Sequence, residues 1–442
     1  GGETKKNVAP GFIERLRLKQ RLRKENANLR SKIPTGSILL ISENGFYTDR
    51  FDNQKINRHI DPLVHLLNDK HPVYKLQLGN ERDGGHHWKK TIFYQPFYFN
   101  RLYNSQRSDP KIPSMHVISE YGKKMTGLDS PEFSDEFVRR SRMFWRLYHT
   151  WLHVLDIIKP SAVFVVCYYS TSNLALMAAA RAKGIATVDV QHGKQGMYHA
   201  MYTHFSKIPS NGYEMLPSVF LNWGNESVHN MKAHSPGIEK THALCAVGNA
   251  WTALWKQKNE MKFNHPFLDE IKKHERVILV SLQPIEPVMP DFLKEAIKNS
   301  PANWLWLLRW HPSQKPDEKL IDELKQSSAT VESEQASTIF LYALLPLCHV
   351  HVTAWSSVCF EANAMGVATI IVHPNGKKLY ESQINNHHFG YSESARDILG
   401  YIKDPAGIPN RPTGYIIADK DEVQKKLFAL VEKIKQPQVA ER

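Results

Sequence analysis

Residues 350–370 read VHVTAWSSVCFEANAMGVATI and contain the clearest structural signal of the chain. An apolar strand pattern over 349–353 is followed by a pair of serines, a helical pattern over 357–365 and a second strand pattern over 368–372. Two strands joined through a helix form a βαβ unit, in which the strands lie parallel. The stretch therefore predicts a parallel sheet with a helix packed on one face.

The same alternation of strand and helix patterns continues outward in both directions. Apolar runs of strand length occur at 37–42, 73–78, 162–167, 186–190, 218–221, 277–281 and 304–309. The series restarts after about residue 245, so it predicts an α/β protein with two doubly wound, Rossmann-like parallel-sheet domains that face a cleft. We expect a basic N-terminal helix or linker over 1–33, a first sheet domain over 34–245, and a second over 246–442 that ends in a closing helix.

The composition is that of a folded, cytoplasmic protein. Hydrophobic residues make up 42% of the 442 residues and charged residues 23%, which excludes a disordered chain. No apolar run approaches the ~20 residues needed to span a bilayer, and the basic N-terminus does not resemble a signal peptide. The four cysteines form no CxxC pair, so we expect a reducing compartment. The chain begins Gly1-Gly2 rather than with Met, which we interpret as a piece of a longer protein or a cloning remnant.

The formal net charge of +13, from 57 Lys and Arg against 44 Asp and Glu, favours an anionic partner. No zinc-finger spacing, RNA-binding strand motif or helix-turn-helix pattern is present, so we expect no nucleic acid partner. Residues 12–30 predict a helix in which leucines are interleaved with basic residues. Two interpretations of that helix stay open: a solvated linker or short coiled coil, and an anchor on an anionic membrane surface.

The residues that follow apolar strands carry the functional interpretation, because ligands of parallel sheets bind beyond the carboxyl ends of the strands. Ser356 and Ser357 open the helix after strand 349–353, and Glu361 lies one turn further along the same face. Unpaired N–H groups and the positive end of the helix dipole suit a phosphate there, and serine hydroxyls add donors. Glu361 would accept hydrogen bonds from a ribose beside that phosphate. The structural alternative is a helix-capping serine with an ordinary exposed glutamate.

This segment resembles the donor-binding segment of GT-B glycosyltransferases, which has a strand, Ser-Ser or Gly-Ser, a helix with Glu, and a Gly-x-Pro turn. Ala368 stands where Pro is common in that turn. The resemblance implies the GT-B fold, with a nucleotide-sugar donor held mainly by residues 246–442. It leaves residues 34–245 as the acceptor domain.

A second motif, VDVQHGKQG at 188–196, follows another apolar strand. A histidine at the end of a strand, beside glycines that permit close backbone approach, can act as a general base near neutral pH. The alternative is a loop histidine hydrogen-bonded to backbone. Gln-His-Gly resembles a tripeptide of bacterial capsule Kdo transferases and related capsule enzymes, and a similar His-Gly occurs in CDP-glycerol glycerophosphotransferases of teichoic acid synthesis. The resemblance implies that His192 is catalytic, with Gln191, Gly193 and Lys194 in a loop toward the acceptor.

A third motif, Arg309-Trp310-His311-Pro312, ends a predicted strand of the second half. Arg309 or His311 would neutralise the phosphate of the leaving nucleotide, and similar polysaccharide transferases carry an Arg/Lys-x-His-Pro turn at this place. As an alternative, Arg309 could pair with a carboxylate at the core edge, and Pro312 could only break the strand.

Two further strand ends carry candidate residues. Ser281 and Gln283 follow the first strand of the second half and are expected at the donor phosphate. Glu43 and Asn44 follow the first strand of the first half and are expected to face the acceptor. Glu43 is also a second candidate base, for which a solvated loop carboxylate is the alternative.

We predict no metal site and no cofactor. Asp419-Lys420-Asp421 has the DxD spacing of metal-binding carboxylates, but it precedes a helix and is interpreted as a cap. His349 and His351 alternate on one strand without a second pair of ligands, which favours a core or cleft position over zinc. Walker A, GxGxxG, HExxH and GxSxG patterns are absent. The GT-B resemblance also implies a metal-independent enzyme, for which the nucleotide sugar is a substrate.

Together these observations predict a glycosyltransferase that moves a sugar from a nucleotide-sugar donor to a bacterial surface-glycan acceptor of capsule or lipopolysaccharide type, either free or lipid-linked. We expect it in the cytoplasm, or bound peripherally to the inner face of the bacterial inner membrane. Three alternatives stay open: a CDP-alditol phosphotransferase of teichoic-acid type, a nucleotide-sugar epimerase of similar fold, and a non-catalytic glycan-assembly module.

Overall fold

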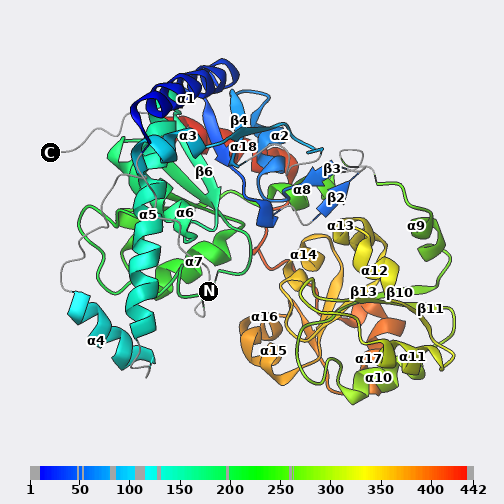
Figure 1. The fold of residues 1–442 in the computed structure, drawn as a ribbon. Helices are drawn as coiled ribbons and strands as arrows, with labels where there is room; N and C mark the ends of the chain where they lie inside the picture. The colour runs from blue at the N-terminus through cyan, green and yellow to red at the C-terminus, as the bar shows by residue number, and fades with distance from the viewer. Residues whose placement is uncertain are drawn as a thin grey trace.

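The structure, a computed structural model, contains two α/β domains, each built on one parallel sheet (Figure 1). It describes residues 10–46, 49–51, 54–79, 86–104, 115–126, 131–195, 199–257, 261 and 263–435. The predicted architecture of two doubly wound parallel-sheet domains is confirmed.

The first sheet has seven strands in the order β5-β4-β1-β6-β7-β8-β9, and every neighbouring pair is parallel. Its strands are β1 (Ile38–Ile41), β4 (Val73–Leu78), β5 (Thr91–Tyr94), β6 (Ala162–Val166), β7 (Ala186–Val190), β8 (Val219–Asn222) and β9 (Ala243–Ala246). The chain enters at β1 and winds outward first to one side and then to the other. The direction of winding changes between β1 and β6, and a parallel sheet binds ligands beyond the strand ends at such a point.

Successive side chains along these strands point to opposite faces of the first sheet and pack into two cores, one on each face. In β6, Val163 and Val165 point to one face, whereas Phe164 and Val166 point to the other. The first face is covered by α5 (Pro131–Ile158) and α6 (Thr171–Ala182), and the second by α2 (Asp61–Leu67), α8 (Ala250–Lys256) and α18 (Lys420–Lys435). Burial on both faces is the reason that the strands read as continuous apolar runs.

The second sheet has six parallel strands in the order β12-β11-β10-β13-β14-β15. They are β10 (Arg276–Ser281), β11 (Trp304–Arg309), β12 (Thr330–Glu332), β13 (Val350–Thr353), β14 (Ala368–Ile371) and β15 (Gly390–Tyr391). One face packs against α10 (Asp291–Lys298), α11 (Glu318–Lys325) and α17 (Ala395–Lys403), and the other against α12 (Glu334–Thr338), α13 (Leu341–Leu344) and α14 (Val358–Ala364).

The remaining elements are short, apart from α1, α4 and α7. They are α1 (Phe12–Lys32), η1 (Asn44–Phe46), β2 (Asp49–Phe51), β3 (Gln54–Ile56), α3 (Phe97–Phe99), η3 (Asn100–Asn104), α4 (Met115–Thr126), α7 (Asn225–His234), η4 (Ile238–Lys240), α9 (Pro266–Ile271), η5 (Leu345–Leu347), α15 (Pro374–Leu379), α16 (Glu381–Asn385) and η6 (Pro405–Gly407). Strands β2 and β3 form an antiparallel hairpin. Ile56 of this hairpin is buried in the core of the second domain, so the hairpin bridges the two halves.

The strands that the sequence did not predict as part of the sheets are edge strands. The two edges of the first sheet are β5 and β9, and those of the second sheet are β12 and β15. An edge strand has a single neighbour and fewer buried side chains, so it lacks the continuous apolar run that marks a central strand. The predicted domain boundary at residue 245 falls inside β9.

The end of the chain returns to the first domain. Helix α18, red in Figure 1, buries Val423, Leu427 and Val431 between the first sheet, α2 and α8. The closing helix, which the sequence assigned to the second domain, therefore packs on the first. An apolar stripe on a helix shows that the helix is packed, but does not show which sheet it covers.

The N-terminal helix α1 also belongs to the first domain. Leu18 and Leu22 pack against Phe99 and Leu102, and Leu29 joins the core under α5. These contacts are those of a docked helix, not of a solvated linker or a coiled coil.

The segment around Ile417, which leads from the second domain back to α18, passes close to Gly248 of the first domain. The Asn249 N–H donates to Ile417 O (3.0 Å). Gly248 has a φ of +125°, and a Cβ atom there would lie 2.5 Å from a Val423 methyl group and 2.7 Å from Ile417 O. Only glycine adopts this positive φ and leaves room for these two neighbours without strain.

We predict that Gly248→Ala lowers the free energy of unfolding by about 3 kcal/mol, because a strained backbone and overpacking act together. Gly237→Ala is the matched control, since Gly237 has a φ of +87° but no atom within 4 Å of an added Cβ. The control should lose only about 1 kcal/mol. Urea denaturation of both variants checks the prediction, and equal losses would contradict the close approach at Gly248.

Candidate functional site

Residues after β1, β6 and β7 lie at one edge of the first sheet, because these neighbouring strands are parallel. Side chains from these three loops contact one another. Ser170 Oγ donates to Glu43 Oε1 (3.2 Å), and His192 Nε2 lies 3.2 Å from Cys167 Sγ. The loop after β6 thus brings the two candidate bases, Glu43 and His192, into one cluster.

The His192 imidazole has one nitrogen in contact with protein and one without a partner. Nε2 lies 3.3 Å from the Tyr169 hydroxyl, in addition to the Cys167 contact. Nδ1 is buried and has no hydrogen-bond partner among the described residues. A buried unpaired nitrogen is costly in a protein interior. With the proton on Nε2, Nδ1 presents a lone pair that can accept a proton from a substrate.

Burial also keeps this imidazole neutral. It lowers the pKa of His192 to about 4, and the positive charges of His199 and Arg58 act in the same direction. At neutral pH the ring therefore holds a lone pair rather than a positive charge. An anionic ligand bound nearby would oppose these effects and raise the pKa toward neutrality.

Glu43 is half-buried rather than solvated. Burial raises its pKa, against hydrogen bonds from Ser170 and Asn173 that lower it. Ser170 in turn caps α6 by accepting from Asn173 N (3.2 Å), so the carboxylate is tied to the start of that helix. Asn44 begins the η1 turn, and its side chain lies outside the described part of the chain.

The Gln191 side chain connects the loop after β7 with both domains. It is fully buried. Trp223 N donates to Gln191 Oε1 (2.7 Å), while Gln191 Nε2 donates to Gly193 O (2.8 Å) and to the Tyr415 hydroxyl (3.4 Å). Gln191 and Gly193, which the sequence assigned to a loop toward the acceptor, therefore take part in the domain junction.

Lys194 extends the same junction. Its ammonium group donates to Leu379 O (3.2 Å) and lies over the ring of Tyr380 (4.3 Å) and farther from that of Phe360 (5.8 Å). Burial lowers the pKa of Lys194. Because Phe360 is adjacent to Glu361 in α14, this contact brings the loop of His192 next to the helix with the predicted donor residues.

At the second sheet, the turn after β13 carries Ser356 and Ser357. Trp355 N donates to Gln283 Oε1 (2.9 Å), and Ser356 N donates to Thr353 Oγ1 (3.1 Å). Ser357 is half-buried at the start of α14, and within the described ranges its N–H and hydroxyl have no partner. The predicted residue Gln283 thus shapes the turn, and a donor role for Ser357 stays a prediction.

Glu361 is buried rather than exposed, with 7% of its surface accessible. The Tyr342 hydroxyl donates to Glu361 Oε1 (2.7 Å) and lies 3.0 Å from Thr252 Oγ1 of α8. The carboxylate is therefore held by α13, and through Tyr342 it is linked to α8 of the first core. The alternative of an ordinary solvated glutamate is wrong.

Ser281 is engaged inside the second sheet. Its hydroxyl lies 2.9 Å from His351 Nε2, and His351 Nδ1 lies 3.1 Å from Thr369 Oγ1 on the next strand. Burial lowers the pKa of His351 to about 3. His349 Nδ1 accepts from Val277 N (3.1 Å). His351 is thus a buried, hydrogen-bonded part of the sheet, as the core alternative predicted, whereas His349 is exposed just before β13.

Arg309 and His311 do not join the cluster. The Arg309 guanidinium donates to Ala336 O (2.6 Å) and Ile339 O (2.7 Å), where it ties the end of β11 to α12. His311 is exposed, and its Nδ1 contacts Ser313 Oγ (2.7 Å). The structure therefore gives Arg309 a structural role at the end of α12 and leaves His311 on the surface.

Sequence reasoning missed Arg58, His59 and Tyr342. The His59 ring lies 6.2 Å from that of His192, edge-on, and Arg58 Nε donates to His59 Nε2 (3.4 Å). The Arg58 charge lowers the pKa of His192 and also acts on Tyr342 of the second domain. The sequence analysis looked for functional residues directly after predicted strands, which we call the strand-end rule. Residues 57–60 follow a hairpin instead, so this rule gave no signal for them. It would have found Cys167, directly after β6.

Across the described ranges, His, Cys, Asp and Glu side chains nowhere gather in threes or more as metal ligands. In the same part of the chain, the helices fall short of the length and apolarity required to cross a membrane.

Comparison with known proteins reveals likeness at the level of the fold. No protein-family model and no curated protein sequence matches the chain. The UDP-GlcNAc 2-epimerase of Neisseria meningitidis bound to UDP-GlcNAc shares 12% identity, with a TM-score of 0.54 over 90% of this chain and 100% of that one. A putative UDP-N-acetylglucosamine 2-epimerase of Listeria monocytogenes shares 12% identity and a TM-score of 0.54 over 91% and 97%. The wall teichoic acid polymerase TagF shares 9% identity and a TM-score of 0.48 over 97% and 100%.

The fold is of the GT-B type. Two parallel-sheet domains, with the loop after β7 in contact with α14 and α15, agree with this assignment. The expected GT-B fold is therefore confirmed, whereas the likeness to capsule Kdo transferases stays a prediction.

We predict that His192 titrates with a midpoint of about 4 in the ligand-free protein, because burial and the nearby positive charges disfavour the imidazolium. NMR of ring-labelled histidines over a pH series measures the midpoint. His192→Asn identifies the signal by its loss. A midpoint near 6.5 would contradict the buried, neutral ring.

Proposed function

We propose that the protein is a metal-independent GT-B glycosyltransferase that moves a sugar from a nucleotide-sugar donor to a bacterial surface-glycan acceptor. One observation carries the proposal. His192, with an unpartnered buried Nδ1, lies at the carboxyl edge of the first sheet, and the loop that contains it touches α14 at the carboxyl edge of the second. This arrangement supports a base and a nucleotide-binding helix on opposite sides of one junction.

The donor would bind at the second domain. The Ser357 N–H and hydroxyl, with the Ser356 hydroxyl beside them, suit donor phosphate oxygens. Glu361 is already oriented by the Tyr342 hydroxyl, and a carboxylate has about four lone-pair sites, so it can serve several donors at once and suits a ribose hydroxyl.

The acceptor would bind at the first domain. His192 Nδ1 takes the proton of the acceptor hydroxyl while the acceptor oxygen forms a bond to the anomeric carbon of the sugar. The bond from that carbon to the phosphate oxygen breaks, and the nucleotide leaves with the electron pair. The negative charge of the bound donor raises the pKa of His192, which makes it a more effective base in the complex than in the free protein. Glu43 is the second candidate base.

A panel of UDP, CMP, CDP and GDP in a thermal-shift assay tests the donor site. We expect one nucleotide to raise the melting temperature by about 3 °C or more at saturation. Glu361→Ala should abolish the shift, whereas Glu334→Ala, which removes an exposed carboxylate of α12, should preserve it. A panel in which no nucleotide stabilises the wild-type protein would overturn the proposal.

Product analysis tests the reaction itself. With the matching nucleotide sugar and a capsule- or lipopolysaccharide-type glycan, mass spectrometry should detect a glycan extended by one sugar. His192→Ala should slow this step by about 100-fold or more while the thermal shift persists.

Other products would favour the alternatives. Conversion of the nucleotide sugar without any acceptor is the result expected of an epimerase. Transfer of an alditol phosphate from a CDP donor would identify a phosphotransferase. Nucleotide binding with no turnover, and no effect of His192→Ala on a larger assembly, would identify a non-catalytic module.

The N-terminal helix supports a peripheral membrane position for the protein. Phe12, Ile13 and Leu16 of α1 are exposed, and Arg15 and Arg17 stand among them. Apolar side chains beside basic ones suit the surface of an anionic bilayer. Such a position would keep the protein on the cytoplasmic face, where a lipid-linked acceptor would be presented.

Sedimentation with vesicles tests this position. The protein should sediment with phosphatidylglycerol vesicles and not with phosphatidylcholine vesicles, because the attraction is electrostatic as well as apolar. The double variant Phe12→Ser and Ile13→Ser should lose most of the binding. Unchanged binding of that variant would contradict a role for the start of α1.

A further inference from the structure

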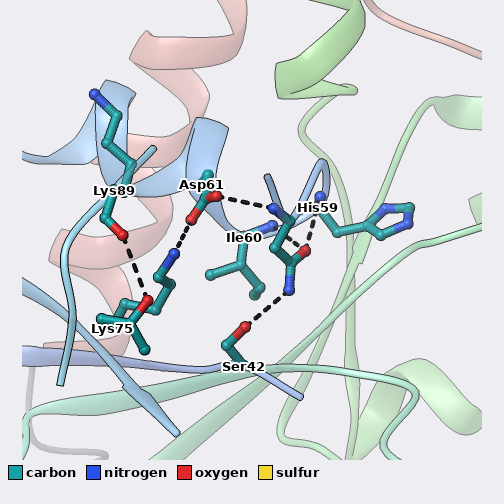
Figure 2. Close-up of polar contacts among 8 residues, drawn as sticks. Ser42, His59, Ile60, Asp61, Lys75 and Lys89 are labelled. Atoms are coloured by element: carbon teal, nitrogen blue, oxygen red, sulfur yellow. Dashed lines mark hydrogen bonds and ion pairs between the residues drawn. The ribbon is translucent and has the colours of Figure 1, made fainter. Parts of the chain in front are cut away.

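The turn over residues 57–60 is fixed by hydrogen bonds from both ends of the Asn57 side chain (Figure 2). Asn57 Oδ1 accepts from His59 N and Ile60 N, both at 3.1 Å. Asn57 Nδ2 donates to Ser42 Oγ (3.0 Å), which directly follows β1. The turn is therefore attached to the carboxyl edge of the first sheet, where the candidate site lies.

A buried ion pair lies beneath this turn. Asp61 and Lys75 are almost completely buried and bond to each other, and Asp61 Oδ2 accepts from Asn57 N (2.9 Å). An ion pair in a protein interior brings little net stability, because desolvation offsets the attraction, but it tolerates few alternative arrangements. Lys75 lies in β4, next to β1 in the sheet. The pair thus holds the turn in one conformation relative to the sheet.

Arg58 and His59 are the residues that the turn presents toward the junction. Figure 2 shows the His59 ring pointing away from the ion pair. That ring lies 5.9 Å from Phe46 and 6.2 Å from His192. Arg58 is half-buried beside it and donates to His59 Nε2 (3.4 Å). Two residues earlier, Ile56 packs in the core of the second domain together with Tyr342, so Arg58 stands at the junction between the candidate base and the side chain that orients Glu361.

The other cations considered for a donor phosphate either lie apart from the cluster or are driven toward the neutral form by burial. Arg309 donates to two backbone carbonyls, His311 is exposed, and Lys194 donates to Leu379 O. Burial favours the neutral form of histidine and lysine, whereas a guanidinium stays charged in a protein interior. A phosphate at this junction needs a cation that keeps its charge when water is excluded.

We propose that Arg58 contacts the donor phosphate from the first domain, and that the Asn57–Asp61–Lys75 network positions it. This inference rests on the proposed function and names a phosphate-binding residue for the same site. It assigns to Arg58 the charge-neutralising role that the sequence assigned to Arg309 or His311. The existing partners of Arg58 in the protein are compatible with this role, because a guanidinium has five N–H donors.

Calorimetry on the wild-type protein and on Arg58→Gln tests the contact. The probes are UDP, CMP, CDP and GDP, each compared with its nucleoside. Arg58→Gln should weaken binding of the preferred nucleotide by about 10- to 100-fold, as expected for a lost charge-assisted hydrogen bond. Binding of the matching nucleoside, which has no phosphate, should change less than about 2-fold. Arg58→Lys should restore part of the affinity, and Arg396→Gln, which removes an exposed arginine of α17, should have no effect.

Asn57→Ala tests the positioning role. It removes the three side-chain hydrogen bonds that fix the turn without touching the ligand, so it should weaken nucleotide binding by about 3- to 10-fold and leave nucleoside binding unchanged. An equal loss for nucleotide and nucleoside would mean that the turn has only a structural role, and would overturn the inference.

The outcomes separate this inference from the proposed function. Wild-type binding that Arg58→Gln leaves intact overturns the role of Arg58 and leaves the nucleotide site standing. If none of the four nucleotides binds the wild-type protein, both are overturned.

Discussion

The side-chain amide of Gln191 is the contact on which the site depends. A fully buried amide must find partners at both ends, and Gln191 finds them on three different segments, at Trp223, Gly193 and Tyr415. Gly193 follows His192 directly, so the same hydrogen bonds shape the loop of the candidate base. Tyr415 belongs to the segment that returns from the second domain, and its hydroxyl also accepts from Gln195 N (2.9 Å). The position of His192 and the contact between the domains are therefore set by one network.

Burial also sets the charges around this network. It lowers the pKa of His192, His59 and Lys194, and raises that of Glu43. Each of these shifts favours the neutral form of the group. Arg58 differs, because a guanidinium does not lose its proton under these conditions. The junction combines a neutral imidazole with a permanent cation, and this combination suits the proposed transfer with its anionic leaving group.

The sequence predicted much of the fold because central parallel strands are buried on both faces. The runs at 162–167 and 277–281 correspond closely to β6 and β10, and the strand-end rule directed attention to Glu43, His192 and Ser357. The same rule could not find Arg58, which follows the β2–β3 hairpin rather than a strand of the sheet. Edge strands such as β9 escaped prediction because their side chains are only half-buried. The sequence did not predict that α18 packs on the first domain, because an apolar stripe on a helix does not identify the surface that it covers.

The sequence by itself determined that two parallel sheets form and which loops stand at their carboxyl edges, because periodicity and apolar runs are properties of consecutive residues. Only the tertiary structure decided what each candidate side chain can do. Arg309 meets the carbonyls of Ala336 and Ile339, and Gln191 meets Tyr415, 224 residues further along the chain. A polar group either forms its hydrogen bonds within the protein or keeps them for a ligand, and such distant partners decide which. A local sequence pattern does not reveal these partners.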